Sequence, residues 1–169
     1  TRFAEEGFIF VYQDVRGRFM SEGTFLNVTP HISNKQDAGD VDESTDMYDT
    51  VEWLLENVRP NNGKVGIWGI SYPGFYAAAS IIDSHPAIAA ASPQAAVVDW
   101  FIGDDFHHNG AFFLQDAFRF FSFFESPGPN PTDQWGPRRD YGSNDAYEFF
   151  LELGPLKNAN EVYFHHTIA

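Results

Sequence analysis

The most constraining feature of the sequence is an alternation of helical and strand-like segments between residues 40 and 91. Acidic residues at 40–43 open a helix whose apolar side chains recur with helical spacing on one face. That face carries Met47, Val51, Leu54, Leu55 and Val58. A short apolar strand at 65–68, an Ala-rich helix at 75–82 and a second strand at 87–91 follow. Strands joined through helices pair in parallel, so the alternation predicts an α/β fold with flanking helices.

The segments on either side extend this expectation. The apolar run Phe8–Tyr12 predicts a further strand, covered on both faces, and the polar stretch from 14 to 40 predicts a long surface loop. Residues 100–125 are rich in Phe at helix-like intervals, and 147–153 predicts one more short helix. We therefore expect part of a sheet domain over residues 1–105 and a helical region over 106–169.

Charge and composition exclude several classes of partner. The formal net charge of −14 repels phosphate backbones and anionic lipid, so we expect no nucleic-acid and no membrane partner. The absence of cysteine excludes disulfides, thiolate zinc sites and cysteine nucleophiles. No apolar run approaches the length of a membrane span, and no basic-then-apolar start marks a signal peptide, although a mature or truncated chain would look the same.

The segment that carries chemistry is Gly69-Ile70-Ser71-Tyr72-Pro73-Gly74, between a predicted strand and a predicted helix. A serine there lies on a sharp turn, with its hydroxyl directed toward substrate. The glycines avoid collisions with the adjacent strand and helix, and the Tyr72 amide is suited to stabilise an oxyanion. The pattern departs from Gly-x-Ser-x-Gly because Pro73 occupies the second glycine position and Gly74 comes one residue later. A structural turn serine is the alternative.

These residues resemble a known family of serine hydrolases. Besides the Ser71 motif, the resemblance depends on Asp14-Val15-Arg16-Gly17, Ser21-Glu22-Gly23, His85-Pro86-Ala87, Asp99-Trp100, Gly103-Asp104-Asp105-Phe106-His107 and Gly110-Ala111-Phe112. The sequence is similar to the family of X-Pro dipeptidyl-peptidases, cocaine esterases and glutaryl-7-aminocephalosporanic acid acylases, and most similar to the α-amino-acid ester hydrolases. The resemblance implies part of an α/β-hydrolase parallel sheet, followed by a helical cap region.

The resemblance also implies roles for individual residues. Ser71 would be the acylated nucleophile, the Tyr72 amide an oxyanion donor, and Asp105 a ligand of the substrate's α-ammonium group, with Asp104 as the rival one position earlier. The implied substrate is a small ester, amide or short peptide, with no cofactor and no metal. The family favours a periplasmic or secreted location, and a homo-oligomer stays open.

Other parts of the implied site are expected outside these 169 residues. In the family, a tyrosine hydroxyl that precedes the strand at Phe8 supplies the second oxyanion donor. The triad Asp and His follow the cap. We therefore expect a middle part of a larger catalytic unit, with no turnover in isolation. The alternatives are an X-Pro dipeptidyl-peptidase, a carboxylesterase and, from another class, a catalytically inert interaction module.

Several other residues have a structural and a functional interpretation. His165 and His166, with Asp133, Asp140 or Asp145, have the chain order of a triad, but no predicted strand presents them. His107 and His108 are adjacent and lack a ligand partner at helical spacing, so a metal role is disfavoured. The acidic stretch 37–49 fails the EF-hand pattern at Thr45 and Val51. Arg16 either binds a substrate carboxylate or, as we favour, braces its turn. The aromatic segment 101–124 lines an acyl pocket or forms the core of the cap.

Overall fold

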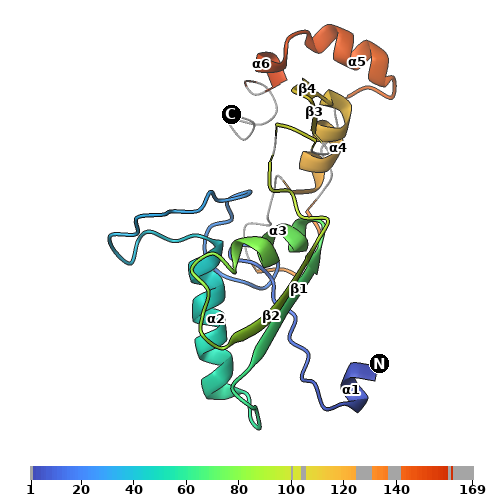
Figure 1. The fold of residues 1–169 in the computed structure, drawn as a ribbon. Helices are drawn as coiled ribbons and strands as arrows, with labels where there is room; N and C mark the ends of the chain where they lie inside the picture. Colours follow the sequence, from blue (N-terminus) through green and yellow to red (C-terminus); the bar gives the residue numbers. More distant parts are fainter. Residues whose placement is uncertain are drawn as a thin grey trace. The chain divides into compact units, whose positions relative to one another are not determined.

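The structure is a computed structural model, and it describes residues 2–99, 101–103, 106–124, 131–136, 142–159 and 161. Its described residues divide into two compact units. One comprises Val28–Ala117, and the other combines Thr1–Asn27 with Phe118–Ala169. Figure 1 shows the elements along the chain.

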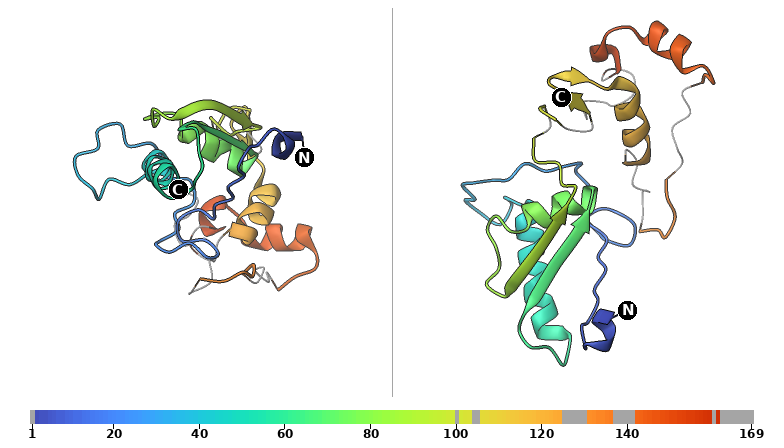
Figure 2. Two further views of the ribbon diagram at one scale, coloured as in Figure 1. Left: turned by 90° about the horizontal axis from the view of Figure 1, so that it is seen from below. Right: turned by 45° about the vertical axis from the view of Figure 1, so that its right-hand side comes forward.

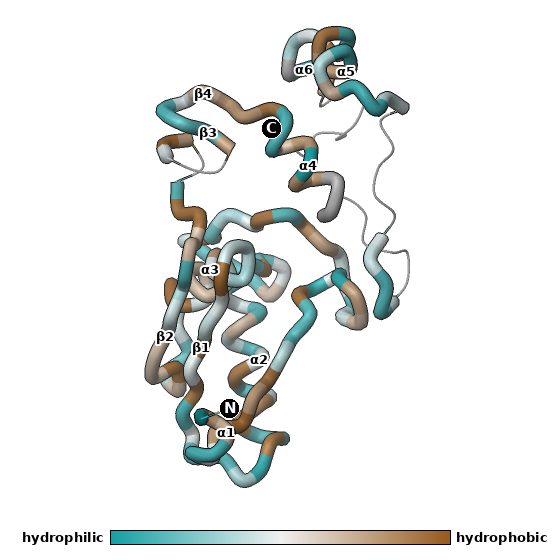
Figure 3. Tube along the Cα trace, turned by 90° about the vertical axis from the view of Figure 1, so that its right-hand side faces the viewer, coloured by the Kyte–Doolittle hydropathy of each residue, from teal (hydrophilic) through white to brown (hydrophobic). Residues whose placement is uncertain are grey.

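The centre of the first unit is a parallel pair of strands, β1 (Val65–Ile70) and β2 (Ile88–Gln94). Their register runs from Gly66 opposite Ala90 to Ile70 opposite Gln94, with an irregularity after Val65. The helix between them, α3 (Tyr72–Ala79), packs against both strands. This is the predicted strand–helix–strand unit, and the parallel pairing is confirmed. Most of both strands is pale to brown in Figure 3, as expected for small and apolar residues.

The predicted amphipathic helix is α2 (Glu43–Asn57), which contacts α3 on the same side of the strands (Figure 2). Its first turn is held by a capping box. The Asp42 side chain accepts the amides of Ser44 and Thr45, and the Thr45 hydroxyl accepts the amide of Asp42. Val51, in the middle of the predicted apolar stripe, is completely buried. Local signals at the start and on one face therefore fix this helix.

The predicted strand at Phe8–Tyr12 is wrong. The segment is extended but pairs with no strand in the described part of the chain. Its apolar side chains are exposed, from 44% for Phe10 to 88% for Tyr12. A strand is stabilised by a hydrogen-bonded neighbour, and the apolar pattern does not specify where that neighbour comes from.

The predicted helix over 100–125 is partly wrong. It begins only at α4 (Leu114–Phe124), and a hairpin of β3 (His107–His108) and β4 (Ala111–Phe112) precedes it. The turn residues Asn109 and Gly110 have φ values of 50° and 83°, as a type I′ hairpin turn requires. The turn therefore overrides the helical spacing of the phenylalanines.

The second unit holds the remaining elements: α1 (Arg2–Glu5), α5 (Ala146–Leu153) and α6 (Leu156–Ala159). The predicted helix at 147–153 is confirmed by α5, where Asp145 accepts the amides of Tyr147 and Glu148 as the N-cap. The predicted domain boundary after residue 105 falls at residues outside the described part and stays a prediction.

Candidate active site

Ser71 lies at the junction of β1 and α3, with a backbone that few non-glycine residues adopt. Its φ of 64° and ψ of −123° are outside the ordinary regions for L-residues, at a cost of about 1–3 kcal/mol. Serine at this position normally caps the helix, but the Ser71 side chain makes no cap hydrogen bond to α3. Ser71 is also exposed. The hydroxyl is therefore not used to cap α3, and the Ser71 residue is exposed at the turn.

Two glycines allow the chain to reverse at this point. A Cβ on Gly69 would lie 2.1 Å from the Pro73 carbonyl oxygen, and one on Gly74 would lie 2.1 Å from the Gln94 carbonyl oxygen. The predicted collisions with the helix and the neighbouring strand are thus confirmed. The second glycine is at 74 because that residue faces β2, while the exposed Pro73 occupies the first turn of α3.

Backbone hydrogen bonds hold the turn on both sides of Ser71. Its amide donates to the Gln94 carbonyl at 2.9 Å, and its carbonyl accepts the Phe75 amide at 3.0 Å. Tyr72 is the first residue of α3, so its amide lies at the positive end of the helix dipole. Both the serine hydroxyl and this amide therefore belong to a rigid junction of sheet and helix.

The Tyr72 side chain connects this junction to the long loop. Its hydroxyl accepts the Val28 amide at 3.1 Å, a contact between residues 44 positions apart. Its ring lies 4.9 Å from the Tyr76 ring, centroid to centroid. The sequence motif gave no signal for this contact, because nothing in it indicates which backbone group the phenol meets.

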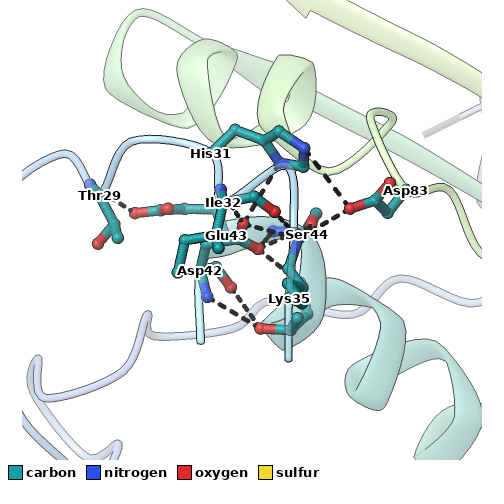
Figure 4. Close-up of polar contacts among 9 residues, drawn as sticks. Thr29, His31, Ile32, Lys35, Asp42, Glu43, Ser44 and Asp83 are labelled. Carbon is teal, nitrogen blue, oxygen red and sulfur yellow. Dashed lines mark hydrogen bonds and ion pairs between the residues drawn. The ribbon is translucent and has the colours of Figure 1, made fainter. Parts of the chain in front are cut away.

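A charged cluster fixes the end of the same loop to the start of α2 (Figure 4). Asp42, only 1% exposed, accepts the Ile32 amide at 2.9 Å and the Ser44 hydroxyl at 2.7 Å. The Lys35 Nζ lies 2.9 Å from Asp42 and 2.7 Å from Asp83. His31 contacts the same two carboxylates, through Nδ1 at 3.3 Å and Nε2 at 3.6 Å.

This environment lowers the pKa of both aspartates of the cluster and raises that of the lysine between them. Burial alone raises the pKa of Asp42, but the Ile32 amide, the Lys35 ammonium and Ser44 outweigh it and hold this pKa well below its usual range. Lys35 lowers the pKa of Asp83, and Asp83 in turn raises that of Lys35. Asp42, Asp83 and Lys35 are therefore held in their charged forms, and the geometry of the cluster is that of a structural tether for the loop.

Glu43, the next residue, has the opposite behaviour. It is 9% exposed, and its Oε1 accepts the Thr29 amide at 3.1 Å. Its Oε2 is buried without a hydrogen-bond partner among the described residues. Burial raises the pKa of Glu43, although the bonds from Thr29 oppose that effect.

His85, part of the sequence resemblance, has a structural role here. Its Nδ1 accepts the Ala87 amide at 3.0 Å, so the ring proton is on Nε2, which donates to Glu52 at 2.8 Å. The histidine is buried and fixes the entry to β2 against α2. Asp99 similarly accepts the amides of Phe101 and Ile102, which lower its pKa.

The other candidate residues are placed as follows. Asp104, Asp105, Asp140, His165 and His166 lie outside the described residues. The His107 ring lies 5.4 Å from the Phe101 ring and 4.9 Å from the Phe112 ring. Arg16 lies against its turn, where a Cβ on Gly23 would be 2.8 Å from its Cγ. Arg18, which the sequence did not single out, is 5% exposed and lies over the rings of Phe19, Phe25 and Trp135.

Within the described ranges the structure holds neither a metal-ligand cluster nor a helix that could span a membrane. No three His, Asp or Glu side chains there are grouped as metal ligands. None of the helices described is both long and apolar enough to cross a bilayer.

Comparison with known proteins gives a consistent result. Residues 1–152 match the model of the X-Pro dipeptidyl-peptidase (S15) family. A cocaine esterase of Rhodococcus sp. (strain MB1 Bresler) is 33% identical over 97 residues, covering 57% of this chain and 15% of that protein. The chain therefore spans a small part of that relative's length.

Two solved structures share the fold, and both are enzymes by their descriptions. An aminopeptidase from a marine sediment Thaumarchaeota archaeon has a TM-score of 0.78 at 32% identity, over 99% of this chain and 26% of that one. An α-amino acid ester hydrolase has a TM-score of 0.73 at 34% identity, over 94% of this chain and 25% of that one. The predicted α/β-hydrolase fold is confirmed.

Proposed function

The chain belongs to the X-Pro dipeptidyl-peptidase (S15) family of hydrolases. From this membership we propose that Ser71 is the nucleophile of a serine hydrolase that acts through an acyl-enzyme. The observation that carries this proposal is the exposed Ser71 at φ 64° and ψ −123°, held between Gly69 and Gly74 without capping its helix. Strained backbone of this kind persists where the surrounding structure fixes it, and a nucleophile elbow is such a case.

The proposed chemistry has two balanced steps. The Ser71 oxygen attacks the carbonyl carbon of an ester or amide while a base, a histidine expected outside these 169 residues, takes the hydroxyl proton. The bond to the alcohol or amine breaks, and the leaving group receives that proton. Water, deprotonated by the same base, then attacks the acyl carbon, the bond to the Ser71 oxygen breaks, and that oxygen receives the proton as the acid is released. The Tyr72 amide donates to the oxyanion in both steps.

The proposed substrate is an α-amino-acid ester or the amide that joins an amino-acid side chain to a β-lactam nucleus. The solved relative described as an α-amino acid ester hydrolase supports this choice, as does the aspartate pair Asp104-Asp105 in the sequence. In this proposal Asp105 binds the α-ammonium group and so rejects acyl groups that lack one. Residues 1–105 would form the catalytic core and 106–169 the cap.

A fluorophosphonate probe tests the nucleophile in the full-length protein that carries these residues. We expect a single adduct on Ser71, absent in Ser71→Ala and retained in Ser92→Ala, a control serine on β2. Labelling that survives Ser71→Ala would eliminate Ser71 as the nucleophile. Absence of labelling in the wild type would favour the inert interaction module.

A second candidate is a peptidase or a simple carboxylesterase, favoured by the family match and by the aminopeptidase and cocaine esterase relatives. Both keep Ser71 as nucleophile and differ in the acyl group. Rates on an α-amino ester, its des-amino analogue and an X-Pro dipeptide amide separate the three activities.

A further inference from the structure

Two consecutive backbone amides of the long loop are bound by two different helices. The Val28 amide donates to the Tyr72 hydroxyl at the start of α3, and the Thr29 amide donates to the Glu43 carboxylate at the start of α2. Both distances are 3.1 Å. Figure 4 shows the Thr29–Glu43 contact beside the charged cluster. Val28–Thr29 therefore links the first turn of α2 to the first turn of α3. The helix α3 begins directly after Ser71.

This link holds Val28 in a conformation that valine avoids. Its φ is 56°, and a β-branched residue in the left-handed region is strained. Such strain persists only where neighbouring contacts fix it. The two hydrogen bonds act on the peptide groups at both ends of Val28, so removing either would allow this residue to relax.

Glu43 bears a cost that its helix does not require. The capping box of α2 is made by Asp42 and Thr45, without the Glu43 carboxylate. That carboxylate is nevertheless buried, with Oε2 unpartnered among the described residues and its pKa raised by burial. Thr29 faces it from the loop, and Asp46 adds negative charge from the same first turn of α2. Besides its own backbone amide, which also lowers this pKa, the Glu43 carboxylate binds Thr29, and this is the contact that joins α2 to the loop.

We propose that Glu43 is a positioning residue for the acyl-transfer site: by holding Thr29 it fixes Val28 on the Tyr72 hydroxyl, and so orients the first turn of α3 and its Tyr72 amide. This inference rests on the proposed function. Glu43 touches neither substrate nor Ser71 and acts through the loop. Because an oxyanion donor matters in the transition state, its misplacement lowers kcat and kcat/KM together and leaves KM unchanged.

The test uses the full-length protein with four variants: Glu43→Ala, Glu43→Gln, Tyr72→Phe and the double variant Glu43→Ala/Tyr72→Phe. The measurements are the rate of fluorophosphonate labelling at Ser71, kcat and KM on an α-amino-acid p-nitrophenyl ester, and the melting temperature. We expect Glu43→Ala to lower kcat on the order of tenfold, less than the roughly 100- to 1,000-fold loss for deleting an oxyanion donor. Glu43→Gln retains an oxygen for the Thr29 amide and restores most of the rate.

The matched control is Glu52→Ala, which removes another carboxylate of α2, the one that binds His85. It is expected to lower the melting temperature without changing kcat. Tyr72→Phe removes only the hydroxyl and tests the same link if Glu43→Ala does not fold. The double variant is expected to be no slower than the slower single variant, because both changes break one connection.

The possible failures are distinguishable. Suppose that Ser71 is labelled in the wild type. The positioning role is then overturned if folded Glu43→Ala reacts at the wild-type rate, or if the rate losses of Glu43→Ala and Tyr72→Phe multiply in the double variant. In either case Ser71 remains the nucleophile. If Ser71 is not labelled in the wild type, the proposed function fails, and the positioning role fails with it.

Discussion

The Gln94 carbonyl oxygen lies 2.1 Å from the position that a Cβ on Gly74 would occupy, and it also accepts the Ser71 amide at 2.9 Å. One carbonyl at the end of β2 therefore sets both the approach of α3 and the backbone of the candidate nucleophile. A side chain at Gly74 would displace the helix from the strand.

Gly74→Ala is expected to destabilise the protein by about 1–3 kcal/mol or more, because the clash is with backbone that cannot rotate away. It should also abolish labelling of Ser71. Gly66→Ala is the control on β1, where a Cβ would lie 3.9 Å from the Ala90 carbonyl, an ordinary contact. Urea unfolding compares the two variants. Equal stability would show that the close approach at Gly74 is not required.

Asp42→Asn is expected to remove the part of the acid dependence of stability that comes from the Asp42 carboxylate. The pKa of Asp42 is lower in the folded than in the unfolded state, so its contribution to stability is present above the unfolded pKa and decreases as pH falls through the folded value. The free energy of unfolding, measured with urea from pH 7 to pH 3, gives a difference between wild type and variant at each pH. We expect this difference to decrease toward acid. Asp49→Asn, on the exposed side of α2, is the control. A difference that does not vary with pH would contradict the role of ionised Asp42.

Glu43→Gln is expected to show the reverse trend. The pKa of Glu43 is higher in the folded state, so the folded protein binds this proton more tightly. Relative to the variant, the wild type gains stability as pH falls through the folded pKa, and the gain is complete below the unfolded pKa. The same urea series measures it. If the wild type instead loses stability relative to the variant as the pH falls, the pKa of Glu43 is not raised by folding.

His85→Ala is expected to cost about 1–3 kcal/mol, because the Ala87 amide loses its acceptor at the start of β2. Glu52→Gln keeps an acceptor for Nε2 on a half-exposed side chain and should cost less than about 1 kcal/mol. Chemical denaturation measures both variants. Nitrogen NMR of the imidazole should report a proton on Nε2, and a proton on Nδ1 would contradict the Ala87 contact.

Asp105→Asn is expected to reduce hydrolysis of an α-amino ester far more than that of its des-amino analogue, since only the first carries an ammonium group. Asp104→Asn is the paired variant and identifies which of the two aspartates binds the substrate. Initial rates of both esters measure the ratio. Equal rates for both esters, unchanged by either variant, would remove the ammonium-binding role.

The elements that the sequence predicted well are those with local signals. Asp42 marks the start of α2, the apolar stripe through Val51 marks its buried face, and Gly69 and Gly74 mark the sharp turn around Ser71. Each of these signals lies within a few residues of the structure it specifies. The serine's exposure and unusual backbone then followed from the strand–turn–helix context.

The features that the sequence analysis did not predict depend on residues distant in the chain, or on a turn signal that was given too little weight. The segment Phe8–Tyr12 has strand composition but no neighbour among the described residues, and composition cannot supply one. The contacts Tyr72–Val28 and Glu43–Thr29 join residues whose spacing carries no motif. Asn109-Gly110, by contrast, is a strong hairpin signal that was visible in the sequence, and it outweighs the helical spacing of the phenylalanines.

The second half of the long loop is fastened at two residues, Thr29 by Glu43 and Ile32 by Asp42, while residues 37–39, between Ile32 and the start of α2, remain exposed. A loop secured in this way tolerates added length at its tip, since closure entropy grows slowly with the number of residues. Residues 37–39 are therefore the natural place to insert a short epitope or a fluorescent label without disturbing the turn at Ser71.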